Sequence, residues 1–283
     1  MEQSQRKVAF VTGASRGIGY CTALAFARAG FDVAIAARTV RDGERHAHSL
    51  TDKAGRALPG SLERTADDIR ALGGRVCMVA MDLLDPDSVA AAAKTVLERM
   101  GRVDVLVNNA IYQGGDLNLP LLELQPETLQ RVAQAYMASP LALVQAVLPA
   151  MRERGSGVVI NVTSGAGEGD PPVPAAQGGW GYAYGAGKAA VSRLSGVINA
   201  EHGGDGILAY TVNPGVVSTD ALAATIGDQG VKALGGHCAP PEVPAAVMLW
   251  LATSPEAVAC RNRTVNAQRL VREQQLVADW RHA

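Results

Sequence analysis

The stretch "VTGASRGIG" at residues 11–19 places Gly13, Gly17 and Gly19 between a short apolar run and a helical stretch. Glycine allows a tight turn and a close approach of backbone to ligand, and the N–H groups that open a helix point at an anion. The GxxxGxG spacing differs from the GxGxxG dinucleotide fingerprint but meets the same physical demands. The pattern therefore predicts a loop that binds a pyrophosphate.

Short apolar runs alternate with helical stretches along the rest of the chain. Helix 86–100 is clearly delimited, with Asp85 as N-cap, Pro86 at its first position and Gly101 just past its end. This alternation predicts an α/β fold, a doubly wound parallel sheet with right-handed crossovers in a single domain over 1–283. Six runs are expected to be strands: 8–12, 33–37, 76–81, 103–108, 157–164 and 207–213.

Composition narrows the function classes. A net charge of −1 over 283 residues argues against a nucleic-acid partner or a membrane surface. The N-terminal apolar run is too short for a signal peptide or a membrane span. The scattered cysteines contain no CxxC pair, which favours free thiols and a cytoplasmic location. His46 and His48 have no third ligand at a telling spacing, so we expect no metal site.

Two segments interrupt the alternation. Residues 39–60 are polar and too long for an ordinary connection, and residues 165–181 are rich in proline and glycine. Both are interpreted as surface excursions from one domain, the second as a wall or lid of a substrate pocket. Residues 216–243 are expected to form a substrate loop with a partly apolar lining.

The end of the second strand bears on the cofactor. An acidic residue there would hold a ribose 2′-hydroxyl, but the strand ends in Arg38, and Arg16 in the glycine loop supplies a second guanidinium. Two cations suit a 2′-phosphate, so NADP(H) is favoured, with NAD(H) as the alternative. A solvated Arg38 with an unrelated partner is the competing interpretation. Asp82 could bond an adenine edge, and Asn109 could support a ribose or, as we favour, bond backbone across the strand ends.

Five features then occur in one order: TGASRGIG (12–19), NNA (108–110), Ser164, YGAGK (184–188) and NPG (213–215). Together they resemble the short-chain dehydrogenase/reductase family up to about residue 220. The resemblance implies a Rossmann-like sheet of about seven strands, hydride transfer with NAD(P)(H), a Ser–Tyr–Lys catalytic core of Ser164, Tyr184 and Lys188, and often a tetramer. It also implies that Thr219 contacts the nicotinamide carboxamide and that Lys188 holds the nicotinamide ribose.

The spacing to Lys188 distinguishes the two tyrosines of "WGYAYGAGK" (180–188). A phenol needs a nearby cation to act as an acid–base group near neutral pH. Four residues are about one helical turn, so Tyr184 shares a face with Lys188, whereas Tyr182 points away. We therefore expect Tyr184 to be catalytic, and we place Tyr182, Trp180 and Tyr136 at the substrate pocket. Gly185 and Gly187 suggest close approach by the cofactor or a neighbouring helix.

Seventeen residues make up the expected cofactor site. In chain order they are Gly13, Ser15, Arg16, Gly17, Ile18, Gly19, Arg38, Asp82, Leu83, Asn109, Ala110, Tyr184, Lys188, Pro214, Gly215, Val217 and Thr219.

The chain departs from the family in three places. Tyr136 stands where many members carry an asparagine that helps hold a water beside the lysine. Pro140 cannot donate to the Tyr136 carbonyl, so we predict a kink at 136–140 with that carbonyl facing Lys188 through water, or a packing kink with no catalytic meaning. The twenty residues from Ser164 to Tyr184 are more than usual, and the C-terminus leaves the seventh strand, about 264–267, uncertain.

These features predict an NADP(H)-dependent oxidoreductase that acts on a small-molecule carbonyl or secondary alcohol, as a homo-oligomer, dimer or tetramer. The alternative is an NADP(H)-binding protein with little or no turnover, a sensor or scaffold. A minor third hypothesis keeps the fold for epimerisation or elimination. The sequence does not identify the substrate or the metabolic direction.

Overall fold

The computed structural model describes residues 6–52, 54–225 and 238–280. Seven strands form one parallel sheet in the order β3-β2-β1-β4-β5-β6-β7. The strands are β1 (Val8–Thr12), β2 (Asp32–Ala37), β3 (Val76–Ala80), β4 (Val105–Asn108), β5 (Gly157–Val162), β6 (Ile207–Asn213) and β7 (Thr264–Asn266). The predicted doubly wound sheet is confirmed, with β3, β4 and β5 shorter than expected.

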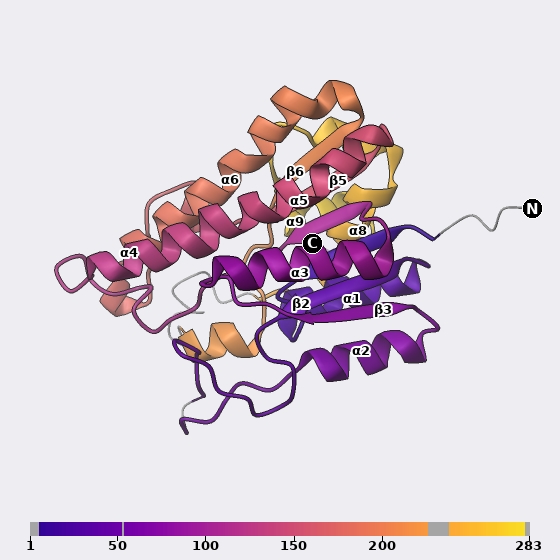
Figure 1. The fold of residues 1–283 in the computed structure, drawn as a ribbon. Coiled ribbons are helices and arrows are strands. Elements are labelled where there is room, and N and C mark those ends of the chain that lie inside the picture. Colours follow the sequence, from indigo (N-terminus) through magenta and orange to yellow (C-terminus); the bar gives the residue numbers. More distant parts are fainter. Residues whose placement is uncertain (1–5, 53, 226–237, 281–283) are drawn as a thin grey trace, which may run out of the picture.

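Helices cover both faces of this sheet (Figure 1). One face carries α1 (Gly17–Arg28), α2 (Leu62–Ala71), α8 (Glu242–Thr253) and α9 (Ala267–Glu273). The other face carries α3 (Pro86–Met100), α4 (Pro126–Ala133), α5 (Ser139–Glu153) and α6 (Tyr182–His202). Two hydrophobic cores result, one on each side of the sheet, which makes the chain a single Rossmann-like domain.

Local sequence explains these elements. Strands β1, β2 and β4 are buried at every position, as expected for parallel strands covered on both faces. Helix α3 begins where the Asp85 side chain accepts from the N–H groups of Asp87 and Ser88, with Pro86 in its first turn. It ends at Gly101, whose φ of 76° is left-handed. The predicted end signals of this helix are confirmed.

A wide turn joins α4 to α5. The five residues of η1 (Gln134–Ala138) are π-helical, and the Ser139 N–H donates to the Gln134 carbonyl five residues back. The predicted irregularity is therefore present, but it is a π-turn that begins two residues before Tyr136, with Pro140 in the first turn of α5. A π-turn adds a residue and changes the direction of the side chains that follow. The predicted water on the Tyr136 carbonyl stays a prediction.

The helical run Pro126–Glu153 is long and apolar enough to cross a membrane by length and composition alone. A core helix passes the same test, and α5 buries Leu143, Val144, Val147 and Met151 against the sheet and α3. The run is therefore weak evidence for a membrane span.

The C-terminal residues complete the sheet edge. Strand β7 pairs with β6 through Thr264, Val265 and Asn266, which resolves the uncertain seventh strand. The Gln268 amide of α9 then donates to the carbonyls of Pro214 and Val216, at 3.3 and 2.9 Å. The atypical C-terminus thus supports the loop after β6.

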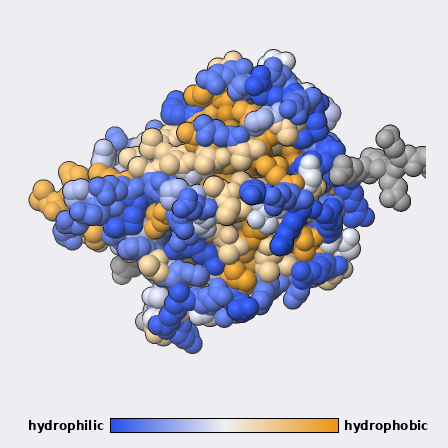
Figure 2. All heavy atoms as spheres, in the orientation of Figure 1, coloured by the Kyte–Doolittle hydropathy of each residue, from blue (hydrophilic) through white to orange (hydrophobic). Residues whose placement is uncertain are grey.

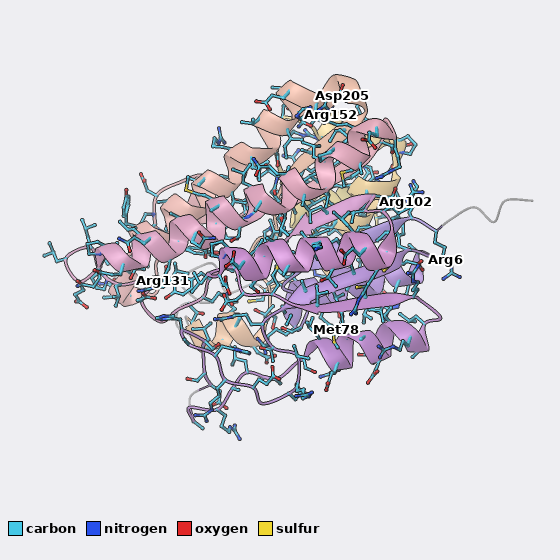
Figure 3. All side chains as sticks on the ribbon, in the orientation of Figure 1. Arg6, Met78, Arg102, Arg131, Arg152 and Asp205 are labelled. Atoms are coloured by element: carbon cyan, nitrogen blue, oxygen red, sulfur yellow. The ribbon has the colours of Figure 1, made fainter. Side chains whose placement is uncertain are left out.

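Side chains and surface follow this layering. Figure 3 shows Arg152 and Asp205, which pair at 2.8 Å, at the far ends of α5 and α6, away from the carboxyl ends of the strands. Figure 2 shows apolar residues at the tip before α4, where Leu121 and Leu122 are exposed. Exposed apolar residues also lie along the outer helices, at Met137, Leu141 and Val197.

Candidate active site

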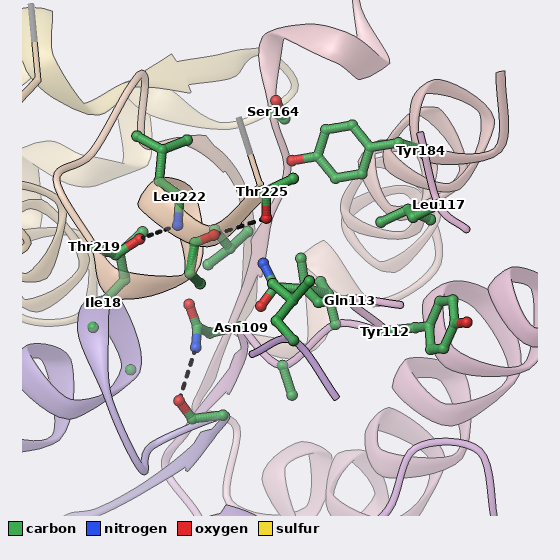
Figure 4. Close-up of a pocket in the computed structure, with 18 of the residues that line it drawn as sticks. Ile18, Asn109, Tyr112, Gln113, Leu117, Ser164, Tyr184, Thr219, Leu222 and Thr225 are labelled. Atoms are coloured by element: carbon green, nitrogen blue, oxygen red, sulfur yellow. Dashed lines mark hydrogen bonds between the residues drawn. The ribbon is translucent and has the colours of Figure 1, made fainter. Parts of the chain in front are cut away.

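A cavity of about 480 Å³ opens at the carboxyl ends of the strands, where chain order reverses between β1 and β4 (Figure 4). Open α/β sheets bind ligands at this switch point. Residues from the glycine loop, the ends of β2 to β6 and the start of α6 line it. All seventeen expected cofactor residues are among the lining residues, together with Ser164 and Trp180.

The glycine loop needs its glycines for geometry. Gly13 and Gly17 have φ values of 68° and 55°, which other residues rarely adopt. A Cβ on Gly19 would lie 2.2 Å from the Gly13 carbonyl oxygen. The loop therefore stays tight, with Ser15 and Ile18 beside the cavity and the first turn of α1 directed at it.

Arg16 makes contacts that the sequence did not predict. Its Nε donates to the Pro59 carbonyl at 2.8 Å, and its Nη2 donates to the carbonyls of Leu58 and Gly60 at 3.1 and 3.0 Å. These bonds tie the 39–60 excursion to the glycine loop, and Thr39, Ser49, Leu50 and Leu58 of that excursion line the cavity. They do not use Nη1, and Arg16 itself lines the cavity, so a second cation for a phosphate stays a prediction.

Arg38 makes fewer hydrogen bonds within the protein than Arg16 does. It donates to the Ala47 carbonyl at 2.9 Å and to the Ser49 hydroxyl at 3.3 Å, and its Nη1 lies 3.9 Å from Asp82 Oδ2. The other oxygen of Asp82 accepts from the Leu84 N–H at 2.9 Å. This end of the cavity thus offers one guanidinium and one carboxylate, both with capacity for further hydrogen bonds.

Asn109 takes the structural role that we favoured. Its amide donates to the carbonyls of Thr12 and Gly13 at 2.9 and 3.4 Å, and the Ala110 N–H donates to the Thr12 hydroxyl. These bonds join the end of β4 to the end of β1. Leu83 follows β3, and its carbonyl accepts from the Ser139 hydroxyl at 2.7 Å.

Ser164, Tyr184 and Lys188 come together at the cavity. Ser164 follows β5, while Tyr184 and Lys188 lie one turn apart in α6; Figure 4 shows Tyr184 pointing toward Ser164. Burial raises the pKa of Tyr184, and the Ser164 hydroxyl lowers it. The Thr163 hydroxyl donates to the Lys188 carbonyl at 3.0 Å, which ties the end of β5 to α6.

Lys188 is buried, with 3% of its surface exposed. Its Nζ donates to the Val162 carbonyl at 2.8 Å and lies 5.5 Å from the centre of the Tyr136 ring. Burial lowers the pKa of Lys188 to about 7. Within the described residues it pairs with no carboxylate. The lysine can therefore lose its charge near neutral pH.

The segment after β6 closes another side of the cavity. Pro214, Gly215, Val217 and Thr219 line it, and Val217 forms a parallel bridge with Ala239. The Thr219 hydroxyl accepts from the Leu222 N–H at 3.1 Å, which starts the next helical turn. Residues 226–237 of the expected substrate loop lie outside the described residues.

Two of the three expected pocket residues need correction. Trp180 lines the cavity, but Tyr182 and Tyr136 are not among the described residues that do. Tyr182 opens α6 on the surface and is 60% exposed. Tyr136 is buried outside the cavity, where its hydroxyl donates to the Tyr112 carbonyl at 2.9 Å. The 165–181 excursion contributes its two ends to the wall, and its prolines lie outside the lining.

Sequence reasoning missed several lining residues at the substrate end. Tyr112 and Gln113 follow NNA directly after β4, and that position at a strand end was the available signal. Figure 4 shows Gln113 between Asn109 and Tyr184. The missed residues include Ile111, Tyr112, Gln113, Leu117 and Asn118, whereas Leu222 and Thr225 belong to the expected substrate loop at 216–243.

Within the three described segments, no three His, Cys, Asp or Glu side chains gather closely enough to hold a metal ion. His46 lies 3.7 Å from Glu44, and the His48 ring meets the Tyr112 ring edge-on at 5.9 Å. Both histidines therefore have contacts within the protein.

Solved structures share this architecture. A metagenomic short-chain oxidoreductase in complex with NADP is 28% identical, with a TM-score of 0.68 over 93% of this chain and 98% of that one. A 7α-hydroxysteroid dehydrogenase complexed with NADH and 7-oxo glycochenodeoxycholic acid is 27% identical, with a TM-score of 0.74 over 92% of each chain.

Sequence comparison agrees. A 3-oxoacyl-[acyl-carrier-protein] reductase of Synechocystis is 31% identical over 261 residues, 92% of this chain and 94% of that protein. A short chain dehydrogenase of Pseudocercospora fijiensis is 34% identical over 221 residues, and the match spans 77% of this chain but only 62% of that protein. The sequence profile of the short chain dehydrogenase family matches residues 7–60 and 54–229. The chain therefore belongs to the short-chain dehydrogenase/reductase family.

Proposed function

We propose that this protein transfers a hydride between NADP(H) and a small carbonyl or secondary alcohol, with Tyr184 as the acid–base group. The observation that carries the proposal is the convergence of Ser164, Tyr184 and Lys188 on the cavity that the glycine loop also lines. A cavity of about 480 Å³ lies within the usual range of volumes for small-molecule binding sites.

The residues present fit a nicotinamide dinucleotide. Gly13 and Gly17 have positive φ values, which favour glycine, and the first turn of α1 offers its N–H groups to a pyrophosphate. Arg38 and Asp82 suit the adenosine end, and Thr219 the carboxamide end. A bound nicotinamide would supply the hydride that the carbonyl carbon receives.

Each catalytic side chain then has a distinct task. The Ser164 hydroxyl donates a hydrogen bond to the substrate oxygen, and the Tyr184 phenol gives that oxygen a proton as negative charge develops on it. The phenolate left behind is stabilised by a positive charge on Lys188 one helical turn away. In alcohol oxidation the phenolate takes the proton back.

A preference for NADP(H) over NAD(H) rests mainly on Arg38, because backbone carbonyls hold the Nε and Nη2 groups of Arg16. A guanidinium at the end of β2 can bind a 2′-phosphate bidentately, whereas a ribose hydroxyl gains little from it. Asp82, 3.9 Å from Arg38, could instead hold a 2′-hydroxyl, so NAD(H) is the alternative cofactor.

We also propose a homo-oligomer and a cytoplasmic location. Exposed apolar side chains on η1, α5 and α6, namely Met137, Leu141 and Val197, support self-association through these helices. The four cysteines are free thiols, three of them buried, which suits a reducing compartment. Light scattering on the purified chain distinguishes monomer, dimer and tetramer.

NADPH oxidation followed at 340 nm with a panel of aldehydes and ketones tests the function. We expect turnover with at least one small carbonyl, and slower turnover with NADH. Tight NADPH binding without hydride transfer across the panel, in either direction, would instead support a binding protein. Absence of both binding and transfer would contradict the assignment of the cavity.

A further inference from the structure

The strongest unexplained feature of the site is the aromatic ring behind Lys188. The lysine lines the cavity, whereas Tyr136, 5.5 Å from its Nζ, does not. The ammonium therefore lies between the cavity on one side and a ring from η1 on another, with the Val162 carbonyl accepting one of its protons. A desolvated ammonium near a ring face is attracted to it electrostatically.

Tyr136 is held firmly in this place. Its hydroxyl donates to the Tyr112 carbonyl at 2.9 Å, and it is 2% exposed. The ring also packs so closely on α6 that a Cβ at Gly187 would come within 2.8 Å of Tyr136 Cδ1. Burial raises the pKa of Tyr136 well above its usual value, so the ring stays neutral while Lys188 titrates.

Tyr112, whose backbone carbonyl accepts the hydrogen bond from the Tyr136 hydroxyl, is itself held in place by hydrogen bonds of its phenol. The Tyr112 phenol donates to Asp116 at 2.5 Å, and Arg131 donates to both groups, to the Tyr112 oxygen at 3.2 Å and to Asp116 at 2.6 Å. Burial alone would raise the pKa of Asp116, but hydrogen bonds from Thr128, Tyr112 and Arg131 lower it to about 2. Figure 3 shows Arg131 extending from α4 beside this loop.

Among the residues that the structure describes, few groups face Lys188. Tyr184 lies on α6 itself, Tyr136 comes from η1, and the end of β5 presents the Val162 carbonyl together with Thr163 and Ser164. Asp116 and Arg131 pair with each other beyond Tyr112. Burial is the cause that lowers the pKa of the lysine, and the Tyr136 ring and the Val162 carbonyl are the groups placed to favour its charged form.

We propose that Tyr136 is a positioning residue for Lys188: its ring stabilises the ammonium from outside the cavity and fills the space through which water would otherwise reach it. The inference rests on the proposed function for its catalytic meaning, since Lys188 acts on Tyr184. It assigns to the Tyr136 ring the place beside the lysine where many family members carry an asparagine. The lysine then exchanges protons through the cavity alone.

Three substitutions of Tyr136 distinguish the effects of its aromatic ring, its hydroxyl and its volume on Lys188. Tyr136→Phe keeps the ring, Tyr136→Leu removes it, and Tyr136→Asn admits a polar group and water. The Lys188 pKa is measured directly by NMR of protein labelled at lysine ¹³Cε, with the signal assigned by its loss in Lys188→Met. This measurement needs no substrate, so it stands even if no carbonyl is turned over.

We expect the pKa of Lys188 to be unchanged by Tyr136→Phe. Tyr136→Leu should lower it by roughly one pH unit, because a desolvated cation–π contact is lost. Tyr136→Asn should raise it, because water and an amide solvate the ammonium. If turnover is found, the alkaline limb of carbonyl reduction should move in the same order.

Two outcomes would overturn the proposal. An unchanged lysine pKa in Tyr136→Leu would mean that the ring does nothing for the ammonium, as expected if the Tyr136 carbonyl holds a relay water instead. A shift in Tyr136→Phe as large as in Tyr136→Leu would assign the effect to the hydroxyl. The phenylalanine variant controls for the hydroxyl. If the leucine variant fails to fold, Tyr136→Asn still tests the proposal, because a lysine pKa that this substitution does not raise would contradict the exclusion of water by the ring.

Discussion

Gly187 of α6 lies against Tyr136 of η1 so closely that a Cβ at residue 187 would come within 2.8 Å of Tyr136 Cδ1. The Val132 side chain of α4 would be equally near. The neighbour that the glycine accommodates is thus a helix, one of the two candidates that the sequence suggested. The same contact holds the Tyr136 ring beside Lys188.

Gly187→Ala should therefore destabilise the protein by about 1–3 kcal/mol, since neither neighbour can move away without disturbing the core. Gly196 is the matched control, because it lies in the same helix with open space around its Cα. Gly196→Ala should stabilise by about 0.5–1 kcal/mol. Urea unfolding of both variants checks this, and equal stability of the two would refute the packing described for Gly187.

Lys188 should impose a pH dependence on stability. Its pKa is about 7 in the folded protein and about 10.5 when unfolded, so the unfolded chain binds more protons between these values. The free energy of unfolding contributed by this group therefore rises with pH across that window, by at most about 1.4 kcal/mol per pH unit. Below about pH 7 the full penalty of burying the charge is present.

Lys188→Met removes this contribution. The stability of the variant minus that of the wild type should be largest near pH 6 and should shrink as the pH rises toward 9.5. Other titrating groups cancel in the difference. Urea unfolding at several pH values measures it, and a constant difference would mean that the lysine keeps an ordinary pKa.

Substitution of Arg38 and of Arg16, the two arginines near the adenosine end, should change cofactor binding in different ways. Arg38→Ala should raise the Kd for NADPH about tenfold or more and leave the Kd for NADH nearly unchanged, because only a 2′-phosphate needs the guanidinium. Arg16→Ala should weaken both cofactors similarly and lower stability, since Arg16 holds the carbonyls of Leu58, Pro59 and Gly60. Fluorescence titration gives all four constants. A selective loss of NADPH binding in Arg16→Ala would support the two-cation hypothesis.

The sequence predicted the sheet and most of the site because both are encoded locally. Strands buried on both faces appear as short apolar runs, and the Asp85 and Gly101 signals delimit a helix without help from distant residues. The strand ends then collect the binding residues by topology. The pairing of Tyr184 with Lys188 needs only the periodicity of one helix.

Contacts between distant segments escaped sequence reasoning. Arg16 meets Pro59 across 43 residues, and nothing in either segment marks the other as its partner. Tyr136 lies outside the cavity, with its hydroxyl bonded to the Tyr112 carbonyl and its ring packed on Gly187, and no local pattern marks these contacts. Tyr182 directly follows the 165–181 excursion, which the sequence suggests as a pocket wall, but at the start of α6 its side chain is exposed at the surface.

The role of Tyr184 is the central claim, and substitution of the two neighbouring tyrosines tests it most directly. With a carbonyl that the wild type reduces, Tyr184→Phe should slow hydride transfer about 10²- to 10⁴-fold while NADPH still binds. Tyr182→Phe should leave the rate unchanged, because that side chain is 60% exposed and outside the described cavity lining. Full activity in Tyr184→Phe, measured as NADPH oxidation in a single turnover, would contradict the account.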